Sequence, residues 1–220
     1  MAGQQRTRVK MCGVTSLADA EEAIRAGVDA LGFIFVESSP RHIEPEKARQ
    51  IIAGLPPFVH FVGVFVDKDG AGVQEIVKYC GLSCVQLHGG ETAEYCSRLA
   101  ADVSPCKIIK AVRVGSHSVP TDFAPYRDIV QGFLLDTHAA DKAGGTGKTF
   151  DWGIIDSLSL TRPIILAGGL TPENVGAAIA GVRPFAIDIN SGVEKRPGVK
   201  DYGKLHALLR EVRKADASRV

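Results

Sequence analysis

The sequence predicts a single-domain (β/α)8 barrel, and two observations indicate this fold. Eight short apolar segments rich in Val, Ile and Phe recur along the chain, starting near residues 8, 30, 61, 84, 107, 132, 163 and 186. Each interval has the length of one strand–helix unit, and no hairpin signal interrupts the series. Segments that are apolar throughout are typical of parallel strands buried on both faces. An open doubly wound sheet is disfavoured, because the first strand–helix turn lacks G-x-G-x-x-G and no linker divides the chain.

The segments between the strands are helical to different degrees. Residues 16–27 have Ser16 as a capping residue, acidic residues in the first turns and Gly27 at the end. Similar patterns predict helices over 43–55, 70–82, 90–101, 171–181 and 199–215. The connections 119–128 and 150–158 are weaker, so short or irregular helices are expected there. The expected organisation is an N-terminal extension over 1–7, a barrel over 8–214 and a tail over 215–220.

Composition excludes several classes of function. The 26 basic and 25 acidic residues give a net charge of +1, which argues against a nucleic-acid or membrane-surface binder. The five cysteines are odd in number and form no CxxC pair, so neither a metal site nor a disulfide framework is expected. No segment has the length and apolarity of a membrane span or leader, and a reducing cytoplasm is the expected location.

Polar residues gather where several predicted strands end. In a (β/α)8 barrel the active site lies at the carboxyl ends of the strands. Lys10 and Cys12 end the first strand and share a face, because strand residues two apart point the same way. His88 ends the fourth strand, Asp136 the sixth, and the eighth carries Asp188. Isolated buried charges are costly, so this cluster indicates a site.

Each of these residues also has a structural interpretation. Cys12 could pack as a small hydrophobe, although a neighbouring Lys10 would favour the thiolate. His88 could cap a helix. Asp136 could be a helix cap, but the residues after it have a loop-like composition. Asp188 could serve as the ion-pair partner of Lys10. The other four cysteines are interpreted as structural.

The ends of the second, seventh and eighth strands carry anion-binding signals. Gly168 and Gly169 follow the seventh strand, with a helix expected to start at residue 171 or 172, and Ser191 and Gly192 follow the eighth. Backbone N–H groups in these two loops form the recurrent phosphate site of this fold. After the second strand, Arg41 offers a fork suited to a carboxylate, or it is a solvated surface residue.

One segment after the sixth strand resembles a nucleotide-binding loop in sequence. The sequence "AGGTGKT" lacks the first glycine of that pattern, because Lys142 stands in its place. We therefore expect residues 137–149 to form a loop that can cover the site.

These motifs together resemble the phosphoribosylanthranilate isomerase family of tryptophan biosynthesis. The similarity rests on "KMCGVT", "GFIFVESSPRHI", "VGVFV", "VQLHG", "LLDT", "GGTGKTFDW", "LAGGLTPENV" and "DINSGVEKRPGVKD", which extend from Arg8 to about Lys204. The resemblance implies a (β/α)8 barrel that catalyses an Amadori rearrangement of a small-molecule substrate as a monomer or homodimer. It implies no metal ion and no organic cofactor.

The resemblance also implies a role for each residue. Cys12 is the expected general base and Asp136 the general acid, and Arg41 holds the anthranilate carboxylate. Lys10, His88 and Asp188 contact the substrate. The phosphate is expected at the backbone of Gly168, Gly169, Ser191 and Gly192.

Two alternatives stay open at this point. A histidine-pathway aminoaldose isomerase shares the fold and reaction type. That class uses a carboxylate where this chain has Cys12, and it has a second phosphate motif that is missing after the third strand. A non-catalytic phosphate-binding barrel is the other alternative, although acid, base and carboxylate clamp would all be present together.

Overall fold

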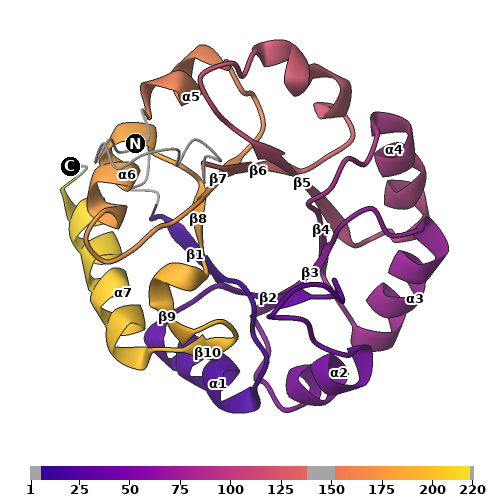
Figure 1. The fold of residues 1–220 in the computed structure, drawn as a ribbon, viewed down its shortest axis with the longest axis horizontal. Helices are drawn as coiled ribbons and strands as arrows, with labels where there is room; N and C mark the ends of the chain where they lie inside the picture. The colour runs from indigo at the N-terminus through magenta and orange to yellow at the C-terminus, as the bar shows by residue number, and fades with distance from the viewer. Residues whose placement is uncertain (1–5, 138–151, 219–220) are drawn as a thin grey trace.

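Eight parallel strands form a closed ring in the order of the sequence (Figure 1). The computed structural model describes residues 6–137 and 152–218, so most of the loop expected over 137–149 lies outside the described residues. Strand β1 spans Arg8–Met11 and pairs with β8, which closes the barrel. The others are β2 (Ala30–Ile34), β3 (His60–Phe65), β4 (Cys84–Leu87), β5 (Lys107–Arg113), β6 (Gly132–Asp136), β7 (Ile164–Ala167) and β8 (Ala186–Ile189). The predicted barrel is therefore confirmed, with each strand starting within one residue of its expected position.

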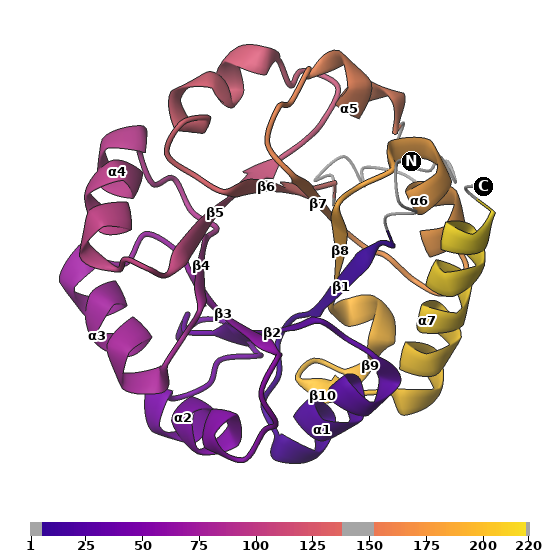
Figure 2. The same ribbon diagram turned by 180° about the vertical axis from the view of Figure 1, so that it is seen from behind.

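Helices surround the ring on its outer side (Figures 1 and 2). Helix α1 is capped as predicted, because the Ser16 side chain accepts a hydrogen bond from the Asp19 amide and Gly27 closes the helix at φ 99°. The helices are α1 (Leu17–Ala26), α2 (Pro45–Ala53), α3 (Gly70–Cys80), α4 (Ala93–Asp102), α5 (Gly153–Ser157), α6 (Val175–Val182) and α7 (Tyr202–Ala217). In the weak connection 119–128 the chain forms two 3-10 turns, η1 (Pro120–Asp122) and η2 (Ala124–Tyr126). The weak connection 150–158 contains the five-residue α5.

A small antiparallel hairpin follows the barrel and differs from the sequence expectation. After the 3-10 turn η3 (Ser191–Val193), strand β9 (Glu194–Arg196) pairs with β10 (Val199–Lys200). The helix expected over 199–215 therefore starts at Tyr202, where the Asp201 side chain accepts a hydrogen bond from the Lys204 amide. The sequence pattern did not reveal this pairing, because strands of two or three residues have no readable periodicity.

The apolar core has an outer layer and an inner layer. The large cluster between strands and helices includes Met11, Phe33, Phe65, Leu87 and Leu135. Two smaller clusters come from the opposite strand faces and fill the barrel interior, namely Ala111, Leu134, Ile165, Ala167 and Ala186, and Cys12 with Ile34 and Val64. Because strand side chains alternate, Lys10 and Cys12 point inward on either side of the outward Met11.

The packed chain extends slightly beyond the expected 8–214 boundaries. The Thr7 amide and hydroxyl both donate to the Asp216 carboxylate, at 2.8 and 2.7 Å. Residues 7 and 216 therefore belong to the folded body, and helix α7 continues to Ala217.

Candidate active site

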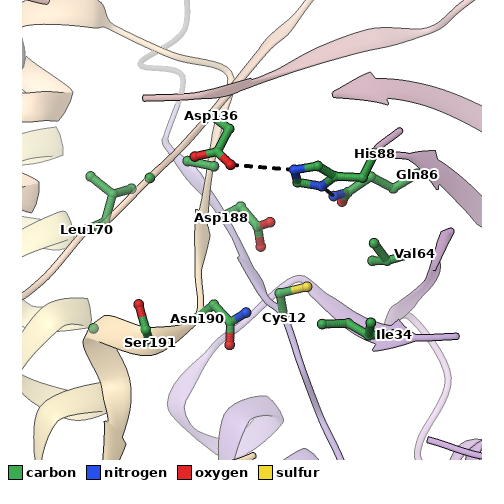
Figure 3. Close-up of a pocket in the computed structure, with 14 residues that line it drawn as sticks. Cys12, Ile34, Val64, Gln86, His88, Asp136, Leu170, Asp188, Asn190 and Ser191 are labelled. Atoms are coloured by element: carbon green, nitrogen blue, oxygen red, sulfur yellow. Dashed lines mark hydrogen bonds and ion pairs between the residues drawn. The ribbon is translucent and has the colours of Figure 1, made fainter. Parts of the chain in front are cut away.

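A pocket with polar and apolar walls opens at the carboxyl ends of the strands (Figure 3). Eight of the ten predicted site residues line it: Cys12, His88, Asp136, Gly168, Gly169, Asp188, Ser191 and Gly192. Lys10 lies below Cys12 on the same strand face, and Arg41 lies beside the pocket. The lining also includes Gln86 and Asn190, which the sequence analysis did not assign to the site.

A buried ion pair forms where the barrel closes. Lys10 and Asp188 are register partners on β1 and β8, and Lys10 Nζ lies 2.8 Å from Asp188 Oδ2. The side chains are 5% and 8% exposed. The second Asp188 oxygen, Oδ1, is buried without a hydrogen-bond partner among the described residues. Asp188 is thus both the ion-pair partner of Lys10 and an acceptor that a ligand can use.

Cys12 lies beside this ion pair and is 5% exposed. Burial raises the pKa of its thiol, and Asp188 raises it further, although Lys10 and the nearby Lys200 lower it. The predicted influence of Lys10 therefore has the expected sign, but desolvation outweighs it. In this surrounding the thiol is the predominant form of Cys12 at neutral pH.

Gly32 on β2 creates the space that these groups occupy. A Cβ at this position would lie 2.9 Å from Cys12 Sγ and 3.0 Å from Lys10 Nζ. A side chain there would displace both functional groups. The position is therefore part of the site, although a lone glycine within a strand gives no functional signal in the sequence.

On the other side of the pocket, β4 and β6 bring three polar side chains together (Figure 3). Gln86 Nε2 donates to His88 Nδ1 at 2.8 Å, and His88 Nε2 lies 3.5 Å from Asp136 Oδ2. With Nδ1 as an acceptor, the ring proton is on Nε2 and faces Asp136. Gln86 Oε1 is buried without a partner in the described part of the chain. The signal for Gln86 was its spacing two residues before His88, which places both on one strand face.

The loops after β7 and β8 bring backbone close to the pocket. Gly168 and Gly169 have φ values of 100° and 64°, a region that favours glycine. A Cβ on Gly192 would lie 1.9 Å from the Leu170 carbonyl oxygen, so only glycine fits between the two loops. Helix α6 begins at Val175, later than expected, because residues 171–174 form a turn in which the Thr171 amide donates to Asn174 Oδ1.

Arg41 does not line the pocket but lies next to the loop that follows Cys12. The Cβ that Gly13 lacks would meet Arg41 Cδ at 2.8 Å. The Arg41 guanidinium donates from Nε to Glu194 Oε1 at 2.9 Å and from Nη2 to Glu194 Oε2 at 2.6 Å. Arg41 is therefore not the solvated surface arginine that the sequence left open, since its side chain is 18% exposed.

Neither a metal-binding group of side chains nor a membrane-spanning helix is found in the part of the chain that the structure describes. No three His, Cys, Asp or Glu side chains there are grouped so that they could hold a metal ion. Across residues 6–137 and 152–218, no helix has the length and apolarity needed to cross a membrane.

The fold and the pocket define a class of protein. A closed (β/α)8 barrel with glycine-containing loops after β7 and β8, and with a cysteine directly after β1 and an aspartate at the end of β6, has the architecture of a barrel enzyme for phosphorylated small molecules.

Comparisons with known proteins identify the family. Residues 9–211 match the family model of N-(5'-phosphoribosyl)anthranilate (PRA) isomerase, so the chain belongs to this family. The N-(5'-phosphoribosyl)anthranilate isomerase of Moorella thermoacetica is 48% identical over 97% of this chain and 92% of its own.

Solved structures give the same result. A phosphoribosyl anthranilate isomerase crystallised with reduced 1-(o-carboxyphenylamino)-1-deoxyribulose 5-phosphate is 40% identical, with a TM-score of 0.81 over 94% of this chain and 99% of that one. Monomers generated from the dimeric isomerase of Thermotoga maritima are 38% identical, with a TM-score of 0.80 over 94% and 98% of the two chains.

Proposed function

We propose that this chain catalyses the Amadori rearrangement of N-(5-phosphoribosyl)anthranilate in tryptophan biosynthesis. The product is 1-(2-carboxyphenylamino)-1-deoxyribulose 5-phosphate. The observation that carries the proposal is the joint placement of Cys12 and Asp136 around one pocket, in a chain that belongs to the PRA isomerase family. The reaction needs one group to give a proton and another to take one, and these side chains suit the two tasks.

The proposed reaction begins at the furanose ring. Asp136 in its protonated form gives a proton to the ring oxygen, the C1′–O bond breaks, and the nitrogen lone pair forms an iminium with C1′. Cys12 as a thiolate then takes the proton from C2′, and the electron pair forms the C1′–C2′ double bond of an enolamine. Transfer of the enol hydroxyl proton to C1′ gives the ketone. A proton returning from Cys12 to Asp136 through solvent restores the starting state.

The ionisation of Cys12 controls this reaction. Because burial raises the pKa of the thiol, the active thiolate is a minor form at neutral pH. Lys10 and Lys200 partly offset this effect through their positive charges. A change that lowers the pKa of Cys12 should therefore raise the rate at neutral pH, because the thiolate must be present together with protonated Asp136.

The substrate contacts follow from the remaining polar groups. The backbone of Gly168, Gly169, Ser191 and Gly192 holds the phosphate. Asp188 Oδ1 and Gln86 Oε1 are buried acceptors without protein partners among the described residues, and they suit sugar hydroxyl groups. His88 contacts the substrate from the Asp136 side.

Arg41 binds the anthranilate carboxylate through the part of its guanidinium that Glu194 leaves available. Replacing Arg41 with Ala should raise KM for the substrate. An unchanged KM would refute this role.

The activity test uses purified protein and freshly formed N-(5-phosphoribosyl)anthranilate. Loss of the substrate's fluorescence over time, absent in a Cys12→Ala variant, is the expected result. A stable signal with the wild-type protein would overturn the proposal and favour a non-catalytic phosphate-binding barrel.

Assembly and location are part of the same proposal. A monomer or a homodimer is expected, and one comparison structure derives from a dimeric isomerase. Sedimentation of the purified chain distinguishes the two states. The family's biosynthetic role supports the cytoplasm as the location, which fractionation of the host cell tests.

A further inference from the structure

The hairpin β9–β10 places two buried charges next to the pocket. Glu194 and Lys200 have side chains that are 3% and 0% exposed, whereas Lys195 and Arg196 on the same hairpin face solvent. Figures 1 and 2 show the hairpin beside α1 and the end of β1. The stability of the hairpin alone does not require these two buried charges, because replacing a buried ion pair by hydrophobic side chains is often neutral or stabilising.

Lys200 connects the hairpin to the base. Its Nζ donates to the Cys12 carbonyl oxygen at 2.6 Å, to Asn190 Oδ1 at 3.0 Å and to Glu194 Oε1 at 3.0 Å. An ammonium has three N–H donors, and these three acceptors satisfy all of them. The backbone of the catalytic strand end is thus fixed by a side chain that lies 188 residues further along the chain.

Glu194 connects the same hairpin to the carboxylate clamp. One of its oxygens accepts from Lys200, from the Gly198 amide and from Arg41 Nε, and the other accepts from Arg41 Nη2. This pairing orients the guanidinium and leaves Arg41 Nη1 outside the ion pair. The hairpin itself is held to the loop after β1, because Thr15 donates its hydroxyl proton to the Gly198 carbonyl.

We infer that Glu194 and Lys200 are positioning residues that hold the base Cys12 and the clamp Arg41 in one fixed arrangement. The inference rests on the proposed function, which gives Cys12 and Arg41 their roles. Each buried charge acts on a different partner: Glu194 acts on substrate binding through Arg41, and Lys200 acts on proton transfer through Cys12. The two substitutions should therefore separate the effects on binding and on catalysis.

The first variant is Glu194→Gln. The remaining amide oxygen can still accept hydrogen bonds from Lys200 and Gly198. The new NH₂ group faces Arg41 Nη2, and because both groups are donors, the hydrogen bond between them is lost. Affinity for reduced 1-(o-carboxyphenylamino)-1-deoxyribulose 5-phosphate should fall roughly tenfold or more, since hydrogen bonds to charged groups have this effect. An analogue without the carboxyl group should bind both proteins equally. Calorimetry measures both affinities.

The second variant is Lys200→Met. Loss of this cation should raise the pKa of the Cys12 thiol and lower kcat at neutral pH, with little change in the affinity for the analogue. Lys195→Met is the matched control, because it removes a lysine from the same hairpin without touching either partner, and it should behave as wild type. Thermal unfolding shows whether each variant is folded.

Two outcomes would overturn the inference. One is that the Glu194→Gln protein binds the carboxylate-bearing analogue as tightly as wild type, or more tightly. Glu194 would then only compete with the carboxylate of the analogue for Arg41. The other is an unchanged titration of the Cys12 thiol in Lys200→Met. If that variant does not fold, the double variant Glu194→Gln/Lys200→Met removes both charges, and its Cys12 must still titrate at higher pH than in wild type.

The inference and the proposed function can fail separately. The Cys12 titration is read as the difference in thiolate absorbance near 240 nm between each protein and its Cys12→Ser counterpart. This absorbance and the analogue affinity require no turnover. A wild-type protein without isomerase activity would refute the proposed function, whereas the two variants decide the positioning roles.

Discussion

Two of the buried lysine–carboxylate pairs among the described residues, Lys10–Asp188 and Lys110–Glu91, differ in how completely their atoms are bonded. Lys110, in the middle of β5, lies 3.0 Å from Glu91 in the loop after β4, and the two side chains are as buried as Lys10 and Asp188. Lys110 Nζ also donates to the carbonyls of Gly89 and Ala111. Both Glu91 oxygens accept backbone amides, from Asp67 and Gly89. The Lys10–Asp188 pair instead leaves Asp188 Oδ1 open towards the pocket.

This difference separates a pair with a structural role from the pair that we propose contacts the substrate. A closed network like that of Lys110 and Glu91 fixes the loop after β4 and has no capacity for a ligand. An incompletely bonded pair in a pocket retains hydrogen-bonding capacity that a substrate can use. Each pair also has a buried cysteine near it, Cys96 beside Lys110 and Cys12 beside Lys10, so matched substitutions can test the comparison.

The largest expected effect is on activity at the two cysteines. Cys12→Ala should reduce kcat by roughly 10²–10⁴-fold, the usual contribution of a positioned proton-transfer group. Cys96→Ala should leave kcat within about twofold of wild type, and each variant should lose about 1 kcal/mol of stability. Steady-state kinetics and urea unfolding measure both quantities. Near-normal turnover of the Cys12→Ala protein would remove Cys12 from the chemistry.

The next effect concerns stability at the two carboxylates. Glu91→Gln should lower the free energy of unfolding by about 3–5 kcal/mol, because it leaves Lys110 buried without a counter-charge. Asp188→Asn should cost less, since Cys12 can ionise and become the counter-ion of Lys10, but it should weaken substrate binding. Urea unfolding and KM give the two readings. Equal stability losses with equal KM values would contradict the comparison.

The smallest effect is a shift in the pKa of Cys12. Lys10 lowers the pKa of Cys12, so Lys10→Met should raise that pKa further. Because the proposed mechanism needs the Cys12 thiolate together with protonated Asp136, a higher Cys12 pKa should lower kcat/KM at neutral pH. Glu91→Gln is the control, and its pH profile should match that of wild type. A Cys12 thiol that titrates at lower pH in Lys10→Met than in wild type, read by thiolate absorbance, would show that Lys10 does not stabilise the thiolate.

Stability has its own pH dependence at Cys12. A folded-state pKa above the unfolded value means that the buried thiol favours the native state at neutral pH. This contribution is lost as pH rises through the folded pKa. The free energy of unfolding should therefore fall at alkaline pH, and it should fall less in Cys12→Ala, as urea unfolding between neutral and alkaline pH would measure.

Much of the site could be predicted because the face on which a strand side chain lies follows from its position in the local sequence. The spacing of Lys10 and Cys12 placed both inside the barrel, and the position of Asp136 after an apolar strand placed it at the rim. Gln86 and Glu194 were missed for different reasons. Gln86 lies on the same strand face as His88 but carries no charge. Glu194 follows a glycine-containing turn in a segment without periodicity.

The sequence by itself determined the number and order of the strands, the inward face of each strand, and the glycine positions after β7 and β8. These features depend on residue spacing over a few positions. Only the tertiary structure decided that Lys10 bonds Asp188, 178 residues away, and that Lys200 reaches the Cys12 carbonyl. It also decided the direction of the Cys12 pKa, because desolvation depends on everything packed around the thiol. Closure of the barrel brings these distant groups together, and no local pattern encodes their separation.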